Sequence, residues 1–248
     1  MAASNGGIDN WEALLVEVQT QWVVQREAIT TYYQSLPHDA HVVGAFVAGI
    51  CVGLLLPKLR QPFRRFSTVD DIPMKLFYQE RQIHAKAVSF SDGDTFRARH
   101  LPFWRGAGAY TGKMSEHTLQ IRLAAIDTPE TAKFGNPGQP FGDEAKKWLS
   151  DNLDGKKLTL TLLHKDQYSR AVCMVEYGHW PFRRNASEEI LKVGLANVYR
   201  QAGAVYGGKQ ERFEKLEAQA QKRKIGIWSQ GKKLETSSAY KARMKAGK

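Results

Sequence analysis

The sequence predicts an α+β fold in which a five-stranded β-barrel of the OB type is packed by about three helices. Short runs in which apolar and polar residues alternate are typical of half-buried strands, and they occur at residues 85–90, 95–99, 118–126, 157–163 and 170–177. Longer segments with helical patterning occur at residues 141–153, 187–193 and 208–224. Several short strands combined with helices favour a small barrel with helices on its surface.

Composition and charge indicate a globular protein with an acidic partner. Of the 248 residues, 42% are hydrophobic and 25% are charged, which excludes a disordered or fibrous chain. The net charge is +11, but residues 1–57 hold one basic and five acidic side chains, so this segment carries −4 and the remainder +15. Nucleic acid and anionic lipid are the partners that such a basic domain favours.

The cysteines and histidines argue against two kinds of site. The two cysteines, Cys51 and Cys173, lie in an apolar run and in a strand-like run, so no disulfide framework is predicted. The seven histidines are scattered and form no zinc-binding motif.

Residues 1–40 are predicted to form an amphipathic helix. Its apolar stripe falls at three- and four-residue steps and comprises Trp11, Leu15, Val18, Trp22, Ile29, Tyr32 and Leu36. This stripe suits packing on its own protein, homo- or hetero-association with a partner helix, or a membrane surface.

Residues 41–59 are predicted to form one transmembrane helix. The run from Val42 to Leu56 is without a polar side chain, and a soluble helix would show a polar stripe. Basic residues such as Lys58 and Arg60 follow it directly, which predicts a single-pass protein whose C-terminal domain stays on the side of synthesis. We expect a linker at 60–82, the folded domain at 83–230, and a disordered basic tail at 231–248.

Four short motifs carry residues suited to phosphodiester cleavage. Carboxylates at strand ends, such as Asp94 and Asp127, are the oxygen ligands that hard divalent cations prefer. Glu130 can deprotonate a water molecule, and arginines such as Arg122 and Arg170 can stabilise charge on a phosphate. The motifs are Asp92-Gly93-Asp94-Thr95, Arg122, Asp127-Thr128-Pro129-Glu130 and Asp166-Gln167-Tyr168-Ser169-Arg170.

Together these motifs resemble the staphylococcal-nuclease family from about residue 86 to residue 228. The matching segments are SDGDTF at 91–96, IRLAAIDTPE at 121–130, DQYSR at 166–170, LKVGLANV at 191–198 and EAQAQKRKIGIW at 217–228. The resemblance implies an OB barrel with three helices and a calcium-dependent endonuclease that cuts DNA and RNA with little sequence preference, leaving 3′-phosphate ends. The N-terminal helix and apolar run resemble the membrane-anchored fungal branch of the family, which implies a mitochondrial location.

The resemblance also implies residue roles. Asp94, Asp127 and the carbonyl oxygen of Thr128 would bind Ca²⁺. Glu130 would act on the attacking water, and Arg122 and Arg170 would bind the scissile phosphate. Asp92 and Asp166 would support these groups.

Some points stay open. Either Tyr199 or Tyr206 replaces the phosphate-anchoring tyrosine of the family, and we expect the long segments 101–117 and 179–186 to border the substrate groove. The alternative function is a catalytically weak, nuclease-like module that is tethered to a membrane and binds nucleic acid or protein. The presence of Asp94, Arg122, Asp127, Glu130 and Arg170 favours the enzyme.

Overall fold

The computed structural model describes residues 9–246, apart from residues 36, 61–63, 104–105, 134 and 180. The chain divides into two compact units, Met1–Gln61 and Pro62–Lys248. The two units are described separately below.

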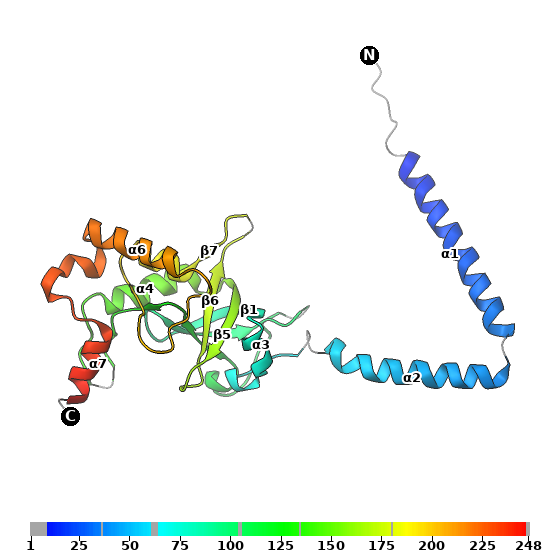
Figure 1. The fold of residues 1–248 in the computed structure, drawn as a ribbon, viewed down its shortest axis with the longest axis horizontal. Helices are drawn as coiled ribbons and strands as arrows, with labels where there is room; N and C mark the ends of the chain where they lie inside the picture. Colours follow the sequence, from blue (N-terminus) through cyan, green and yellow to red (C-terminus); the bar gives the residue numbers. More distant parts are fainter. Residues whose placement is uncertain are drawn as a thin grey trace, which may run out of the picture. The chain divides into compact units, whose positions relative to one another are not determined.

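The N-terminal unit consists of two helices, α1 (Asp9–Ser35) and α2 (His38–Arg60) (Figure 1). Large apolar side chains of both helices, including Leu15, Trp22 and Phe46, are exposed. The helical pattern predicted for the first segment is therefore present, and the described side chains of its apolar stripe are exposed. Leu36 and the side chain of Trp11 lie outside the described part of the chain.

The predicted transmembrane helix at residues 41–59 falls on α2. Within the part of the chain that the structure describes, no helix has both the length and the apolar character needed to cross a membrane. The uninterrupted apolar run of α2 reaches from Val42 to Leu56. At ~1.5 Å per residue, this run spans about 22 Å of a hydrocarbon core ~30 Å thick.

The second unit is built around the predicted five-stranded closed barrel. Strand β1 (Gln82–Phe90) pairs antiparallel with β2 (Thr95–His100) and β5 (Lys157–Lys165), and β2 continues to β3 (Leu119–Leu123). Strand β6 (Ala171–Tyr177) pairs antiparallel with β5 and parallel with β3, which closes the barrel. Two short additions are β7 (Arg184–Asn185) on β6, and the pair β4 (Ile126–Asp127) and β8 (Asn197–Val198).

Alternation along the strands forms the core of this barrel. On β3, Leu119, Ile121 and Leu123 are buried, whereas the side chains between them are partly exposed. Strand β5 contributes Leu158 and Leu160 to the core, and Thr159 between them is buried as well. Full burial of each such side chain contributes about 1.5–3 kcal/mol, so the core dominates the stability of the unit.

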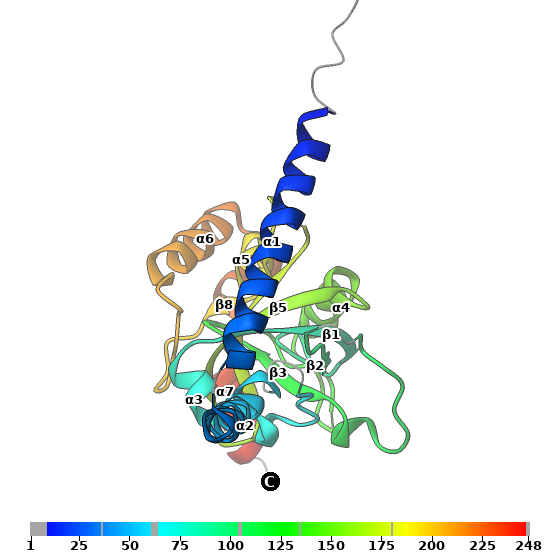
Figure 2. The ribbon, with the colours of Figure 1, turned by 90° about the vertical axis from the view of Figure 1, so that its right-hand side faces the viewer.

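Three helices pack against the barrel, in agreement with the prediction. They are α4 (Gly142–Leu153), α5 (Ala186–Lys192) and α6 (Gln210–Arg223), all labelled in Figure 2. Helix α4 buries Ala145, Leu149 and Leu153 at four-residue steps, and α6 buries its own apolar stripe around Phe213. The helical period in the sequence therefore identifies the faces that are buried.

We expected the segment 60–82 to be a linker, but it contains short helices. It contains the 3₁₀ helix η2 (Val69–Asp71) and helix α3 (Met74–Tyr78). Phe66, Val69, Ile72 and Phe77 are buried in the core of the barrel unit. Elements this short have no measurable periodicity, so their burial was not predicted.

The tail at 231–248 is also more ordered than expected. After the 3₁₀ segment η4 (Gly226–Lys233), the chain forms helix α7 (Ser237–Ala246), labelled near the C-terminus in Figure 1. Ser237 and Tyr240 are buried. The tail is buried through these two isolated side chains and not through an apolar stripe, so the hydrophobic pattern does not predict its order.

Candidate active site

A groove of about 930 Å³ lies over one end of the barrel, and most of the predicted site residues line it. The turn between β1 and β2 contributes Asp94, and the strand β3 contributes Arg122. Asp127 and Glu130 come from β4 and the loop that follows it, and Arg170 from the turn between β5 and β6. The fold thus brings together four motifs that are far apart in the sequence.

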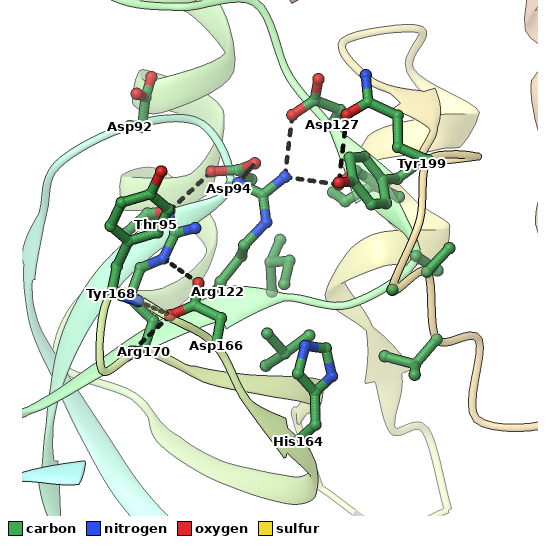
Figure 3. Close-up of a pocket in the computed structure, with 18 of the residues that line it drawn as sticks. Asp92, Asp94, Thr95, Arg122, Asp127, His164, Asp166, Tyr168, Arg170 and Tyr199 are labelled. Atoms are coloured by element: carbon green, nitrogen blue, oxygen red, sulfur yellow. Dashed lines mark hydrogen bonds and ion pairs between the residues drawn. The ribbon is translucent and has the colours of Figure 1, made fainter. Parts of the chain in front are cut away.

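At the centre of the groove, one arginine bridges two carboxylates (Figure 3). Nη1 of Arg122 lies 2.6 Å from Oδ2 of Asp94, and Nη2 lies 2.9 Å from Oδ1 of Asp127. The side chains of Asp94 and Asp127 are 6% and 8% exposed. Burial lowers the pKa of Arg122, but the charges of the two carboxylates outweigh burial and raise that pKa above its usual value.

The turn that carries Asp94 depends on a glycine. A Cβ atom on Gly93 would lie 2.8 Å from Oγ1 of Thr128 and 2.7 Å from the Cβ of Ala145. Only glycine therefore lets this turn approach the loop after β4, which brings Asp94 next to Asp127.

Asp92 connects the same two segments from the buried side. Its Oδ1 accepts hydrogen bonds from the N–H groups of Gly93 (3.2 Å) and Thr131 (3.3 Å). Its Oδ2 lies 2.6 Å from Nζ of Lys133. Asp92 therefore orders the turn and the loop, and Lys133 is a site residue that the sequence reasoning missed. Its position three residues after Glu130 was the signal available.

Asp166 holds Arg170 in the third turn. Oδ1 of Asp166 accepts hydrogen bonds from the N–H groups of Tyr168 and Arg170 (both 2.9 Å), and Oδ2 accepts from Nε of Arg170 (2.6 Å). Burial raises the pKa of Asp166, but these hydrogen bonds with Arg170 and Tyr168 outweigh burial and lower it. The guanidinium carbon of Arg170 lies 5.2 Å from the centre of the Tyr168 ring.

The terminal nitrogens of Arg170 are available to a ligand. Within the described residues, the structure records no protein hydrogen bond or ion pair for Nη1 or Nη2 of Arg170, because its only ion pair uses Nε. Arg170 lines the groove. A planar pair of free N–H donors is suited to two oxygens of one phosphate.

Thr128 differs from the other predicted site residues. It does not belong to the lining of the groove, and only 1% of its surface is exposed. Its carbonyl oxygen accepts a hydrogen bond from Oγ of Ser237 (2.7 Å). A carbonyl oxygen has two lone pairs, so this bond leaves one acceptor position on Thr128.

The structure separates the two candidate tyrosines. Tyr199 lines the groove, and the guanidinium carbon of Arg122 lies 5.6 Å from the centre of its ring. Tyr206 is absent from the lining, and its hydroxyl donates to the carbonyl oxygen of Tyr199 (2.8 Å). Tyr199 therefore faces the groove and Tyr206 supports it from behind.

His164 is a further groove residue that the sequence reasoning missed. Its Nδ1 is buried and makes no hydrogen bond with any described residue. Burial lowers the pKa of His164, so the neutral imidazole is favoured at neutral pH. It lies at a bulge in β5, which the regular alternation of that strand does not reveal.

The two long segments do not border the groove, contrary to expectation. None of the described residues of 101–117 or 179–186 lines it. Arginines hold the first segment against the barrel, because Arg65 donates to the carbonyl oxygens of His100 and Gly106, and Arg99 donates to those of Ala107 and His117.

The donor set of the groove fits a hard divalent cation. The guanidinium of Arg122 shows that oxygens of Asp94 and Asp127 converge on one positive charge. No cluster of three or more Asp, Glu, His or Cys side chains suited to a metal ion occurs among the described residues. A cation here would therefore take two carboxylates from the chain and complete its shell with backbone, water or substrate oxygens, as Ca²⁺ does.

The fold and this groove define a hydrolase of the barrel-nuclease type, and comparison with known proteins agrees. Residues 120–230 match the model of the family described as "Staphylococcal nuclease homologue". "Endonuclease Htp3" of Saprolegnia parasitica is 55% identical over 200 residues, which cover 80% of this chain and 94% of that protein.

More distant relatives carry a similar name. "Probable endonuclease LCL3" of Candida tropicalis is 36% identical over 187 residues (72% of this chain, 80% of that protein). The LCL3 of Komagataella phaffii is 37% identical over 184 residues (68% and 78%). The chain belongs to the staphylococcal nuclease family, and it is a nuclease.

Proposed function

We propose that this nuclease is a calcium-dependent endonuclease that hydrolyses phosphodiester bonds of DNA and RNA with little sequence preference. The observation that carries the proposal is the convergence of Asp94 and Asp127 on one positive charge in a groove that also contains Glu130 and Arg170. This combination provides a cation site, a base and phosphate-binding arginines within one groove.

The proposed division of labour follows from the chemistry of each group. Arg170, with its free terminal nitrogens, binds two oxygens of the scissile phosphate, and Arg122 contributes a second positive charge. Glu130 accepts a proton from the attacking water. Ca²⁺ held by Asp94, Asp127 and the carbonyl oxygen of Thr128 supplies positive charge to the phosphate oxygens when it is bound.

Bond formation and cleavage balance in this scheme. The water oxygen bonds to phosphorus while its proton passes to Glu130. The bond from phosphorus to the 5′-oxygen breaks, its electron pair stays on that oxygen, and the oxygen takes a proton from solvent water. Negative charge grows on the phosphate oxygens as phosphorus becomes five-coordinate, and both arginines stabilise it there. The products are a 3′-phosphate and a 5′-hydroxyl.

The groups that line the groove explain why cleavage should depend little on the sequence of the nucleic acid. The basic side chains of the groove, such as Arg122 and Arg170, recognise phosphate, and phosphate contacts carry no sequence information. The neutral part of the groove contains Tyr168 and Tyr199, whose rings offer surfaces on which any base can stack.

Removal of calcium is the test of this function. The full-length protein should degrade DNA and RNA in millimolar calcium and lose this activity when a calcium chelator is added. Magnesium should support less activity, because it keeps its waters and requires stricter octahedral geometry. Full activity in the chelator would contradict the calcium site. Binding of nucleic acid without cleavage under all conditions would indicate the alternative, a module that only binds.

A further inference from the structure

The loop that carries Glu130 is held at its base by Gln139. This loop spans residues 128–141, between β4 and α4. The N–H group of Glu130 donates to Oε1 of Gln139 (3.0 Å), and the N–H group of Gln139 donates to the carbonyl oxygen of Glu130 (2.8 Å). Gln139 is buried. These two hydrogen bonds fix the backbone from which the Glu130 carboxylate projects.

The start of α4 is packed tightly against the same backbone. A Cβ atom on Gly142 would lie 2.4 Å from the carbonyl oxygen of Glu130. Glycine is therefore needed at position 142 for the helix to approach Glu130 this closely. Because Asp92 also accepts from the N–H of Thr131, the inner side of the loop is well anchored.

The C-terminal segment holds the outer side of the loop. Nε2 of Gln139 donates to the carbonyl oxygen of Glu235 (2.9 Å), and Oγ of Ser237 donates to that of Thr128 (2.7 Å). The hydroxyl of Tyr240 donates to the carbonyl oxygen of Pro137. Ser237 and Tyr240 are only 2% and 5% exposed.

The segment has local structure of its own that supports these contacts. Both side-chain oxygens of Glu235 lie 2.8 Å from nitrogens of Arg243, and the guanidinium carbon of Arg243 lies 5.2 Å from the centre of the Tyr240 ring. Residues at the start of α7 are thereby held in place to reach the loop.

We propose that Gln139, Glu235, Ser237 and Tyr240 form a tail clamp that positions Glu130 for proton transfer, an inference that rests on the proposed role of Glu130 as the base. The tail residues of the clamp contact the loop at Thr128, Pro137 and Gln139, so the contact points bracket Glu130 on both sides. None of its four residues lines the groove. They are positioning residues, which act on the reaction only through the loop.

The clamp has a direct consequence for loop motion that does not depend on activity. Hydrogen exchange of residues 128–141 is measured in the full-length protein without calcium or substrate. The test variant combines Ser237→Ala with Tyr240→Phe, which removes two hydroxyl groups and no core volume. The control combines Ser229→Ala, whose hydroxyl bonds only within η4, with Tyr78→Phe on the surface.

The test variant should speed exchange of the Glu130 and Gln139 amides about tenfold, because local opening loses two hydrogen bonds that resist it. The control should leave these amides unchanged. Equal exchange in the test and control variants would overturn the clamp.

Kinetics then connect the clamp to Glu130. Gln139→Ala should lower kcat by about tenfold to a hundredfold, since a small displacement of a catalytic group costs this much, while KM stays close to the wild-type value. Gln210→Ala on the exposed face of α6 is the matched control. In a Glu130→Gln background, Gln139→Ala should cause no further loss of kcat.

The outcomes separate this inference from the proposed function. An equal loss of kcat in both backgrounds would show that Gln139 does not act through Glu130 and would overturn the clamp as a positioning device. A wild-type protein that cleaves no nucleic acid would contradict the proposed function instead, and the exchange measurement would still decide whether the clamp holds the loop.

Discussion

Glu130→Gln should lower kcat by about 10²–10⁴-fold, with little change in the affinity for nucleic acid. Glutamine has nearly the same shape but cannot accept the proton of the attacking water, and general-base catalysis contributes this much. The two hydrogen bonds between Glu130 and Gln139 use only backbone atoms of Glu130 and should persist. Single-turnover cleavage of a labelled oligonucleotide, with binding measured separately, checks the expectation.

Glu211→Gln is the matched control for this substitution. Glu211 is exposed in the first turn of α6, so its change alters the net charge by the same amount without touching the groove. If both variants retain the wild-type kcat, Glu130 is not the base.

Arg170→Lys should lower kcat by about 10²–10³-fold, a loss of about 3–4 kcal/mol of transition-state stabilisation. Lysine keeps the positive charge, so binding of the substrate should weaken little. The guanidinium of Arg170 can reach two phosphate oxygens while its Nε remains bonded to Asp166, and lysine has no such planar fork. Because the lost geometry matters most when charge on the oxygens is greatest, the effect should be on kcat.

Arg212→Lys on α6 controls for the chemical change, since Arg212 is half exposed and pairs with Glu188 away from the groove. The melting temperature of both variants should match that of the wild type. A kcat for Arg170→Lys within about threefold of the wild type, far from the loss expected for a lost transition-state donor, would mean that Arg170 only adds to the basic surface.

The barrel was predictable because its strands have strong local patterns. Leu119, Ile121 and Leu123 alternate with polar residues, and burial follows that alternation. The helices α4 and α6 were predictable from their apolar spacing. For α2, the absence of polar residues predicts a membrane span, whereas no helix in the described part of the chain has the length and apolar character to cross a membrane, and the run from Val42 to Leu56 is short for a bilayer.

The site was predictable as far as its motifs reach. Asp94, Arg122, Asp127, Glu130 and Arg170 line one groove, as the four motifs suggested, although their catalytic roles stay predictions. The supporting contacts were not predictable, because they join residues about a hundred positions apart through single hydrogen bonds. The bond from Ser237 to the carbonyl oxygen of Thr128 is one example, and that from Gln139 to Glu235 is another. Neither has a periodic or compositional signal.

The central claim is that Glu130 and the two arginines direct a water molecule at phosphorus. Cleavage of a DNA oligonucleotide by the full-length protein in calcium and ¹⁸O-labelled water, followed by mass spectrometry of the fragments, tests it most directly. The scheme predicts 3′-phosphate ends that each carry one ¹⁸O atom, because the water oxygen bonds to phosphorus and the 5′-oxygen leaves. Fragments that end in a 5′-phosphate, or 3′-phosphates without the label, would contradict it.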